Sequence, residues 1–302
     1  MLINLKKGVQ SEVDIYRNDR NYYEELMGLT GADELKELVN KWNILSENIS
    51  SRSMDAPIVI PNLFIYTKPG LGNTKMLALL AGYLESKGNL VNFYGSVKFF
   101  EFKLEYCAPH TPFSEMYRLI EAINTAAGFR SEYRGIIRIS VDEWVDHHDE
   151  KHFTDFLQFL ERNTSHWLIV LTISDTDEND KTKKMEGIAS MYLRLKKLAL
   201  RMPTTTEFIE SAAYQLAQYG FELEDGARVL LSESIDVLRK NKHFYGKHTI
   251  TDLCRDIVYT LFSESVAVDP LITADMLADF AADSDYVKRT AHKFDGSRKL
   301  GY

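Results

Sequence analysis

The chain has 302 residues, and its 36 Lys and Arg stand against 44 Asp and Glu, which gives a formal charge of −8. Its composition is 45% hydrophobic and 12% aromatic, which is enough for the core of one large or two modest globular domains. The acidic balance argues against a general nucleic-acid binder, because such proteins usually carry a basic surface.

Cysteine use and the length of the apolar runs indicate a soluble protein of a reducing compartment. The 2 cysteines, Cys107 and Cys254, are too few and too far apart for a disulfide framework or a Cys-based zinc site. Residues 1–20 turn polar too early for a signal peptide. Runs such as Leu168–Ile173 have the length of a buried strand, whereas a membrane-spanning helix needs roughly 20 apolar residues. We therefore expect a cytoplasmic protein without a membrane segment.

The first predicted element is a helix from Tyr22 to about Ile49. Its apolar residues recur at spacings of three and four, as on one face of an amphipathic helix. They are Leu35, Leu38, Trp42 and Leu45. A stretch over residues 50–61 that contains Ser, Arg and Pro separates this helix from the next block.

An alternation of strands and helices comes next in the chain. Asn62–Tyr66 predicts a short buried strand, Thr67–Gly72 a turn with Pro and Gly, and Asn73–Lys87 a helix that ends before a glycine. The later segments are strand Leu90–Phe102, helix Ser114–Ala127, strand Gly135–Glu143, a helix around Phe153–Leu160 and strand Trp167–Ile173. This order predicts a mainly parallel sheet covered by helices.

The pattern changes after the last of these strands. Ser174–Gly187 is dense in Asp and Lys and predicts a polar loop. The later segments are helical, over 207–219, 224–240, 248–263 and 273–283. A boundary near Pro203 therefore separates an α/β part from an all-α part, and residues 295–302 are expected to be frayed.

The segment YTKPGLGNTK, Tyr66–Lys75, lies between a predicted strand and a predicted helix, which is the context of a phosphate-binding loop. Glycines there let backbone N–H groups approach phosphate oxygens, and the helix N-terminus adds positive potential. The full pattern is G-x-x-x-x-G-K-[ST]. Its four defined positions are held here by Thr67, Gly72, Asn73 and Thr74.

The missing lysine is the main departure from this pattern, because its ammonium group neutralises charge on the β- and γ-phosphates. Lys75 does not obviously replace it, since it lies two residues further on, about 200° around the helix. Lys68, in the loop itself, is another candidate to contact a phosphate. The alternative interpretation of the segment is an ordinary Pro-Gly turn between a strand and a helix.

A second motif, IIRISVDEW at Ile136–Trp144, is an apolar strand that ends in Asp142 and Glu143. In nucleotide hydrolases such a carboxylate pair holds Mg²⁺ and polarises the attacking water. Arg138 is unusual in a strand that should be buried. The alternative interpretation is a strand that ends in a solvated acidic turn.

Two further polar segments have simpler explanations. The cluster DHHDEKH, residues 146–152, places His148 and His152 four residues apart. Asp149 stands where a zinc hydrolase has glutamate, and no third ligand is evident, so a solvated helix start is favoured over a metal site. The basic residues within 288–299 favour a solvated chain end over a surface for an acidic partner.

In chain order, the two motifs and four further segments resemble the AAA+ ATPases. These segments are MGLTGADELKELVNKW, NTSHWLIVLTISD, LALRMPTTTEFIE and HFYGKHTITDLCRDIVYTLF. The resemblance runs from about Tyr22 to Ala282, and the nearest group is that of red-type Rubisco activase and the stage V sporulation protein K. It implies a P-loop-type α/β domain with a parallel sheet, followed by a small all-α lid.

The resemblance also implies a domain division and partners. A helical lead-in would cover residues 1–55, the nucleotide-binding domain 56–203, and the lid with its tail 204–302. The implied cofactors are ATP and Mg²⁺. The implied partners are a protein client or a paralogous AAA+ subunit, in a homo- or hetero-oligomeric ring.

Individual roles are implied by positions that match the family. ATP-binding positions are Pro69, Gly70, Gly72, Asn73, Thr74, Lys75 and the lid residue His248. Thr74 and Asp142 would hold the metal, Glu143 would orient water, and Arg201 would act on the site of a neighbouring subunit.

Three features of the family fall on less defined positions. The polar sensor falls at Thr172 or Ser174, and the pore-loop aromatic residue at Tyr106. The apolar entry beside adenine falls at Leu26, Met27 and Leu29. For this apolar entry, plain helix packing is the alternative interpretation.

Two positions depart from the family, because Asn73 replaces a lysine and His248 replaces an arginine. Each change removes a cation from the triphosphate, and loss of an arginine finger alone lowers turnover about 10³–10⁵-fold. We therefore expect an AAA+ ATPase-like remodelling or assembly factor with weakened ATP binding and hydrolysis. The alternative is a pseudo-ATPase scaffold or adaptor that works with an active partner. A nucleic-acid motor shares the fold, but the net charge of −8 argues against it.

Overall fold

The chain divides by its internal contacts into two units. In the computed structural model, one unit comprises Met1–Lys68 with Asn73–Arg201, and the other comprises Pro69–Gly72 with Met202–Tyr302. We call them the α/β unit and the helical unit. The structure describes residues 21–52, 60–87, 98–106, 117, 121, 135–164, 167–174, 179–241, 244–264 and 269–292.

The α/β unit is built on a five-stranded sheet in the order β2-β3-β4-β1-β5, and every pair of neighbouring strands is parallel. The strands are β1 (Asn62–Tyr66), β2 (Lys98–Lys103), β3 (Gly135–Ser140), β4 (Trp167–Ile173) and β5 (Leu195–Ala199). β4 is buried along its whole length, as expected for a parallel strand covered on both faces.

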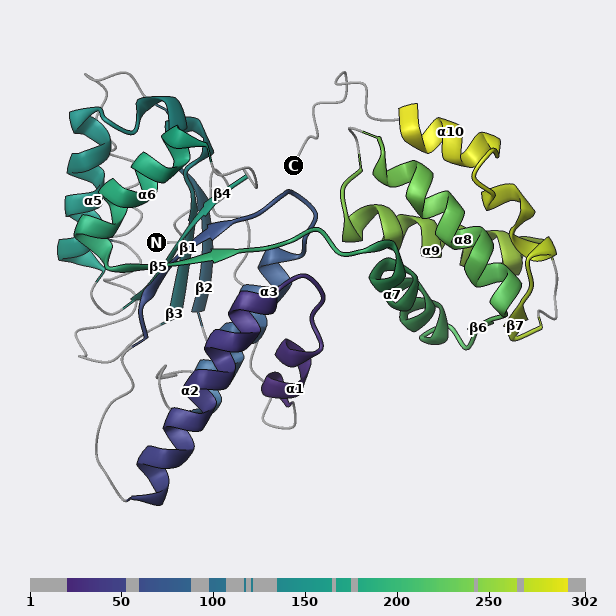
Figure 1. The fold of residues 1–302 in the computed structure, drawn as a ribbon, viewed down its shortest axis with the longest axis horizontal. Helices are drawn as coiled ribbons and strands as arrows, with labels where there is room; N and C mark the ends of the chain where they lie inside the picture. The colour runs from purple at the N-terminus through teal and green to yellow at the C-terminus, as the bar shows by residue number, and fades with distance from the viewer. Residues whose placement is uncertain are drawn as a thin grey trace, which may run out of the picture. The chain divides into compact units, whose positions relative to one another are not determined.

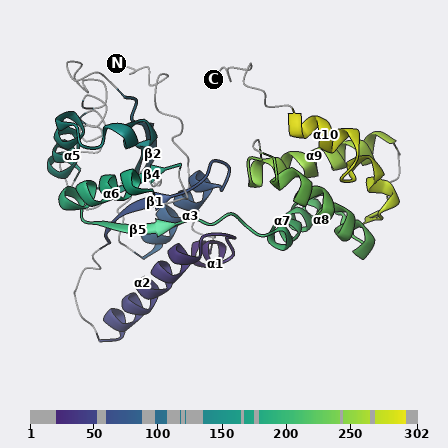
Figure 2. The same ribbon diagram turned by 45° about the horizontal axis from the view of Figure 1, so that its top comes forward.

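Helices cover both faces of this sheet, with α5 (Lys151–Asn163) and α6 (Asp180–Leu193) on one face and α3 (Asn73–Ser86) on the other (Figures 1 and 2). Alternation of side chains along each strand separates the two faces. Thus Ile137 and Ile139 of β3 belong to the buried cluster of α5 and α6, and the intervening Arg138 faces α3.

Two helices precede the sheet in the chain, α1 (Tyr22–Met27) and α2 (Asp33–Ser51). α1 packs on α3 where Gly82 leaves room for the ring of Tyr22, since a Cβ at Gly82 would lie 2.4 Å from that ring. The ring of Tyr22 is buried, so this small residue fixes how closely the two helices approach.

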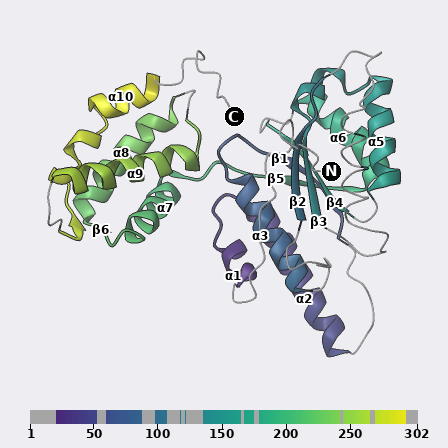
Figure 3. The same cartoon turned by 180° about the vertical axis from the view of Figure 1, so that it is seen from behind.

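The helical unit is a bundle with its own buried core (Figure 3). Its elements are α7 (Thr205–Ala217), β6 (Glu222–Leu223), α8 (Asp225–Arg239), α9 (Lys247–Glu264), β7 (Leu271–Ile272), the 3₁₀ helix η2 (Asp275–Phe280) and α10 (Asp285–His292). A capping box starts α7: the Thr204 hydroxyl accepts the Glu207 N–H, and the Glu207 carboxylate accepts the Thr204 N–H. The core of the helical unit includes Phe208, Leu231 and Ile257.

The predicted α/β class, a parallel sheet followed by a helical part, is confirmed. Several boundaries differ from expectation. The helix predicted from Tyr22 to Ile49 is interrupted between Met27 and Asp33. The prediction of a polar loop at Ser174–Gly187 is wrong from Asp180 onward, where α6 begins. The side chain of Asn179 caps this helix by accepting the N–H groups of Lys181 and Thr182.

Other differences concern the ends of elements. β3 stops at Ser140, so Asp142 and Glu143 start the 3₁₀ helix η1 (Asp142–His147) and do not end the strand. The helix predicted over 273–283 is the shorter η2, and α10 comes after it. The helix predicted over 114–127 lies largely outside the described residues, as does the tail after residue 292. No described helix is both long and apolar enough to cross a membrane.

Candidate functional site

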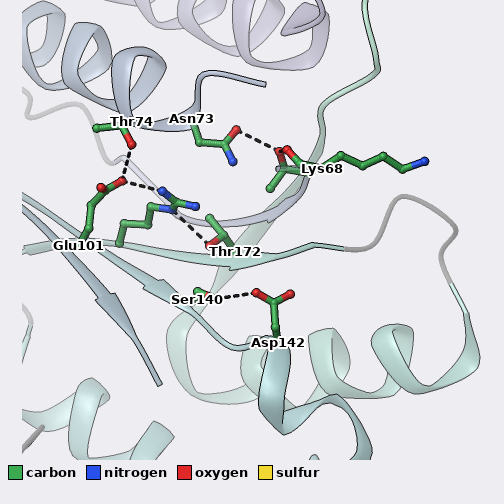
Figure 4. A network of polar contacts seen from close by, with 9 residues as sticks. Lys68, Asn73, Thr74, Glu101, Ser140, Asp142 and Thr172 are labelled. Atoms are coloured by element: carbon green, nitrogen blue, oxygen red, sulfur yellow. Dashed lines mark hydrogen bonds and ion pairs between the residues drawn. The ribbon is translucent and has the colours of Figure 1, made fainter. Parts of the chain in front are cut away.

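The carboxyl ends of β1, β3 and β4 meet at one edge of the sheet and bring the two sequence motifs together (Figure 4). β4 lies between the other two strands, so its Thr172 is paired in register with both Ile65 and Ser140. In open α/β sheets this edge is where ligands bind. The start of α3 and the acidic residues after β3, both in the α/β unit, therefore lie at the same edge of the sheet.

Two glycines of the loop between β1 and α3 have a left-handed backbone. Gly70 and Gly72 have φ angles of 83° and 80°, a region that suits glycine. The Gly70 carbonyl accepts the Lys247 N–H at 2.9 Å, and a Cβ on Gly70 would lie 2.0 Å from the Tyr245 carbonyl oxygen. Pro69–Gly72 thus packs with the helical unit, and α3 begins directly after it.

Asn73, at the position of the missing lysine, is turned into the protein. Its side-chain oxygen accepts the Thr67 hydroxyl at 2.9 Å, and the residue is only 9% exposed. Lys75 is exposed on α3, and Lys68 extends away from the polar network that surrounds Thr74 (Figure 4). The contact of Lys75 with nucleotide stays a prediction.

Thr74 takes part in a network that crosses the sheet below α3. Its hydroxyl donates to Oε1 of Glu101 on β2 at 2.9 Å, and Nη1 of Arg138 donates to the same oxygen at 2.6 Å. Nε of Arg138 donates to the Thr172 hydroxyl at 3.3 Å. The unusual arginine of β3 is therefore paired, and it links three neighbouring strands to the start of α3.

Asp142 is held by the strand ends and not by Thr74. Its carboxylate accepts the Ser140 hydroxyl at 2.5 Å, the Ser174 N–H at 2.5 Å and the Ser174 hydroxyl at 3.2 Å. The two candidates for the polar sensor thus have different contacts. Thr172 is buried and bonded to Arg138, whereas Ser174 is exposed and bonded to Asp142.

This arrangement does not fit the Mg²⁺ site that the resemblance implies. The two expected ligands, Thr74 and Asp142, are bonded to different protein partners. Within the described ranges, no three or more His, Cys, Asp or Glu side chains are grouped so that they could hold a metal ion. This also holds for the histidine cluster, where Nδ1 of His148 lies 2.7 Å from the Val145 carbonyl oxygen.

Glu143, the candidate water-orienting residue, is tethered to the end of β2. It forms an ion pair with Lys103 at 2.5 Å and accepts the Tyr106 N–H at 2.8 Å. These two contacts hold the pKa of the Glu143 carboxyl below its ordinary value, and the contact with Lys103 has the larger effect. The Tyr106 ring stacks on His147 with centroids 3.9 Å apart, so the predicted pore-loop aromatic residue packs beside the site.

Arg201 and His248 lie at the remaining predicted positions. Nε of Arg201 donates to Asp33 at the start of α2 at 2.6 Å, with both side chains about half exposed. His248 is exposed in the first turn of α9.

The three apolar residues predicted to lie beside adenine differ in their solvent exposure. Leu26 is buried at the end of α1, and Met27 and Leu29 are half-buried. Helix packing alone accounts for the burial of Leu26, because α1 packs on α3. The adenine contact stays a prediction.

Glu101 and Lys103 are the site residues that no sequence motif indicated. Both lie on β2, in the segment KFFEFK. Arg138 offered the available signal, since an arginine in a buried strand requires an acidic partner. Glu101 is opposite Arg138 in the register of β2 and β3.

No protein-family model matches the chain, and no curated protein matches its sequence. Among solved structures, a mutant of RuvB from Thermotoga maritima matches with a TM-score of 0.52 and 14% identity, over 84% of this chain and 71% of that one. PCH-2 of C. elegans matches with a TM-score of 0.51 and 14% identity, over 95% and 76%. Both are AAA+ ATPases, so the chain has the AAA+ fold. The narrower resemblance to red-type Rubisco activase and the stage V sporulation protein K stays a prediction.

Proposed function

We propose that the chain is an AAA+-type remodelling or assembly factor of the cytoplasm that binds ATP weakly and hydrolyses it slowly. The observation that carries this proposal is the buried hydrogen bond between Asn73 and Thr67, at the position where a phosphate-binding loop needs a lysine. The shape of the loop and the start of a 14-residue helix support phosphate binding by backbone N–H groups.

In this proposal the main candidate residues have separate roles. The N–H groups from Gly72 to Thr74 hold the phosphates, and Glu143 orients the attacking water. Arg201 acts on the nucleotide of a neighbouring subunit in a homo- or hetero-oligomeric ring. Turnover is slow because Asn73 and His248 supply no fixed cation to the phosphates.

The test is to restore the missing lysine and measure ATP binding by calorimetry and phosphate release from the same sample. Asn73→Lys should raise both, because an ammonium group about 4 Å from a phosphate charge contributes up to about 4 kcal/mol at an effective dielectric constant near 20. The folded state should lose about 0.5–1.5 kcal/mol, since the Thr67 hydroxyl loses the Asn73 oxygen at 2.9 Å and keeps only the Lys68 carbonyl at 3.2 Å as an acceptor. Asn48→Lys, on the exposed side of α2, adds the same charge elsewhere and serves as the control.

A second substitution tests the role of Glu143. In the Asn73→Lys background, Glu143→Gln should abolish the phosphate release that was gained and leave ATP binding in place. Unchanged release would remove Glu143 from the proposed mechanism. An ATP affinity equal to that of the original chain in Asn73→Lys would contradict the proposed loop function itself.

The second candidate function is a pseudo-ATPase scaffold or adaptor that works with a client protein or a paralogous AAA+ subunit. The observation that favours it is the tether of Glu143 to Lys103 and Tyr106, which occupies both carboxylate oxygens. This candidate predicts no ATP binding at millimolar concentrations. It also predicts that Glu143→Gln leaves complex formation with the partner unchanged.

A further inference from the structure

Arg138 brings a permanent positive charge under the first turn of α3. Its strand neighbours Ile137 and Ile139 are fully buried, and its own side chain is 20% exposed. Burial of a charge at such a position requires a partner, and Glu101, itself 12% exposed, supplies it at 2.6 Å. The guanidinium is therefore a fixed component of the site, held on one side by Glu101 and on the other by Thr172.

The carboxylate beside Thr74 already has its counter-charge without a metal. Glu101, the carboxylate that Thr74 contacts, is neutralised by Arg138. Asp142, the other carboxylate, is satisfied by three hydrogen bonds from Ser140 and Ser174. A divalent cation beside Thr74 would meet the guanidinium as a like charge, and it would gain only a carboxylate that is already paired.

We propose that Arg138 takes the place of the divalent cation in this site. The chain then binds neither Mg²⁺ nor Mn²⁺ by itself, and it binds nucleotide equally well with and without divalent metal. The metal part of this proposal is independent of any nucleotide. The nucleotide part rests on the proposed function.

The first experiment uses Mn²⁺ alone, followed by the paramagnetic resonance signal of the free ion. The full chain should leave this signal unchanged at millimolar Mn²⁺. Arg138→Met should bind about one Mn²⁺ per chain, because Glu101 then becomes an unpaired carboxylate beside the Thr74 hydroxyl. Arg138→Lys keeps the charge and should stay metal-free, as should the control Arg162→Met, which removes an exposed arginine of α5.

One result would overturn the proposal directly: stoichiometric Mn²⁺ uptake by the unmodified chain that is lost in Asp142→Asn. Failure of Arg138→Met to bind Mn²⁺ while it retains the native circular dichroism spectrum would do the same. If Arg138→Met does not fold, the affinity of the Glu101→Gln variant for metal-free ATP tests the proposal in its place. This variant leaves the guanidinium without its counter-charge, so it should bind metal-free ATP more tightly than the unmodified chain, and an unchanged or weaker affinity contradicts the proposal.

The second experiment titrates a fluorescent ATP analogue in Mg²⁺ and in EDTA at matched ionic strength. For the unmodified chain the two affinities should agree within about threefold, whereas Mg²⁺ should strengthen binding to Arg138→Met at least about tenfold. If the unmodified chain binds the ATP analogue much more tightly in Mg²⁺ than in EDTA, the proposal that Arg138 takes the place of the metal is refuted. Absence of nucleotide binding in every variant refutes the proposed function instead, and the Mn²⁺ experiment still decides the role of Arg138.

Discussion

The ion pair between Glu101 and Arg138 allows a quantitative test of the site by double-mutant cycle. The N–O distance is 2.6 Å, and the side chains are 12% and 20% exposed. Breaking a fully buried pair costs about 3–5 kcal/mol, because one charge is left without compensation, whereas an exposed pair is worth about 0–1 kcal/mol. For this largely buried pair we expect about 2–3 kcal/mol of lost stability in Glu101→Gln or Arg138→Met alone.

The double variant leaves no charge uncompensated, so its loss should be smaller than the sum of the two single losses. The expected coupling free energy is about 1–2 kcal/mol. Urea unfolding followed by tryptophan fluorescence measures it, because Trp42, Trp144 and Trp167 all belong to the α/β unit.

Lys181 and Asp146 provide the matched control for this cycle. Their charged atoms lie 2.5 Å apart, close to the 2.6 Å of the buried pair, but their side chains are 61% and 68% exposed. Coupling between them should vanish in high salt, whereas coupling between Glu101 and Arg138 should persist, since burial limits screening. Additive losses in Glu101→Gln and Arg138→Met would refute the ion pair and with it the proposal that Arg138 takes the place of a divalent cation.

Three further predictions concern individual side chains. Lys103→Met should raise the pKa of Glu143, measured by carbon NMR. The ion pair with Lys103 stabilises the folded state fully above the ordinary pKa of Glu143, and this stabilisation is lost as the pH falls through the lowered pKa of the folded state. In Lys103→Met the free energy of unfolding should therefore no longer show this fall at acidic pH. Gly70→Ala should destabilise the chain by about 2 kcal/mol or more in thermal unfolding, because φ is positive there and the Cβ meets the Tyr245 carbonyl; an unchanged Tm would contradict this packing. Burial raises the pKa of Cys254 to about 12, so in a Cys107→Ser background its thiol should react with a maleimide at neutral pH only after unfolding, and rapid labelling of that folded variant would contradict the burial.

The sequence predicts the buried strands best, because a parallel strand covered on both faces is a continuous apolar run. β1 and β4 are of this kind. β5 lacks this pattern, because its sequence LKKLA belongs to an edge strand in which two lysines interrupt the apolar residues. The sequence of α6 resembles a polar loop, because its first turns are charged and its buried residues lie among lysine, glutamate and small side chains. These buried residues are Thr182, Met185, Ala189 and Leu193.

The candidate site is predictable from sequence only where its residues are adjacent in the chain. The loop of Gly70 and Gly72 and the pair of Asp142 and Glu143 each form a local pattern. Their actual partners come from strand register, and no local pattern indicates it. Glu101 lies opposite Arg138 only because β2 pairs with β3 in one particular register.

Among the described strands, β5 lies at the edge of the sheet and pairs with β1 alone. Such an edge leaves a row of backbone groups available to another chain, which is a route to aggregation. Here the start of α2 covers its end: the Glu34 carboxylate accepts the Ala199 N–H at 2.6 Å, and the Gly31 carbonyl accepts the Arg201 N–H at 3.1 Å. Two lysines on β5 add charge to the same edge. We therefore expect the segment that contains α1 and α2 to limit pairing of β5 with other chains. A chain shortened to begin at β1 should form insoluble aggregates even though its sheet is intact.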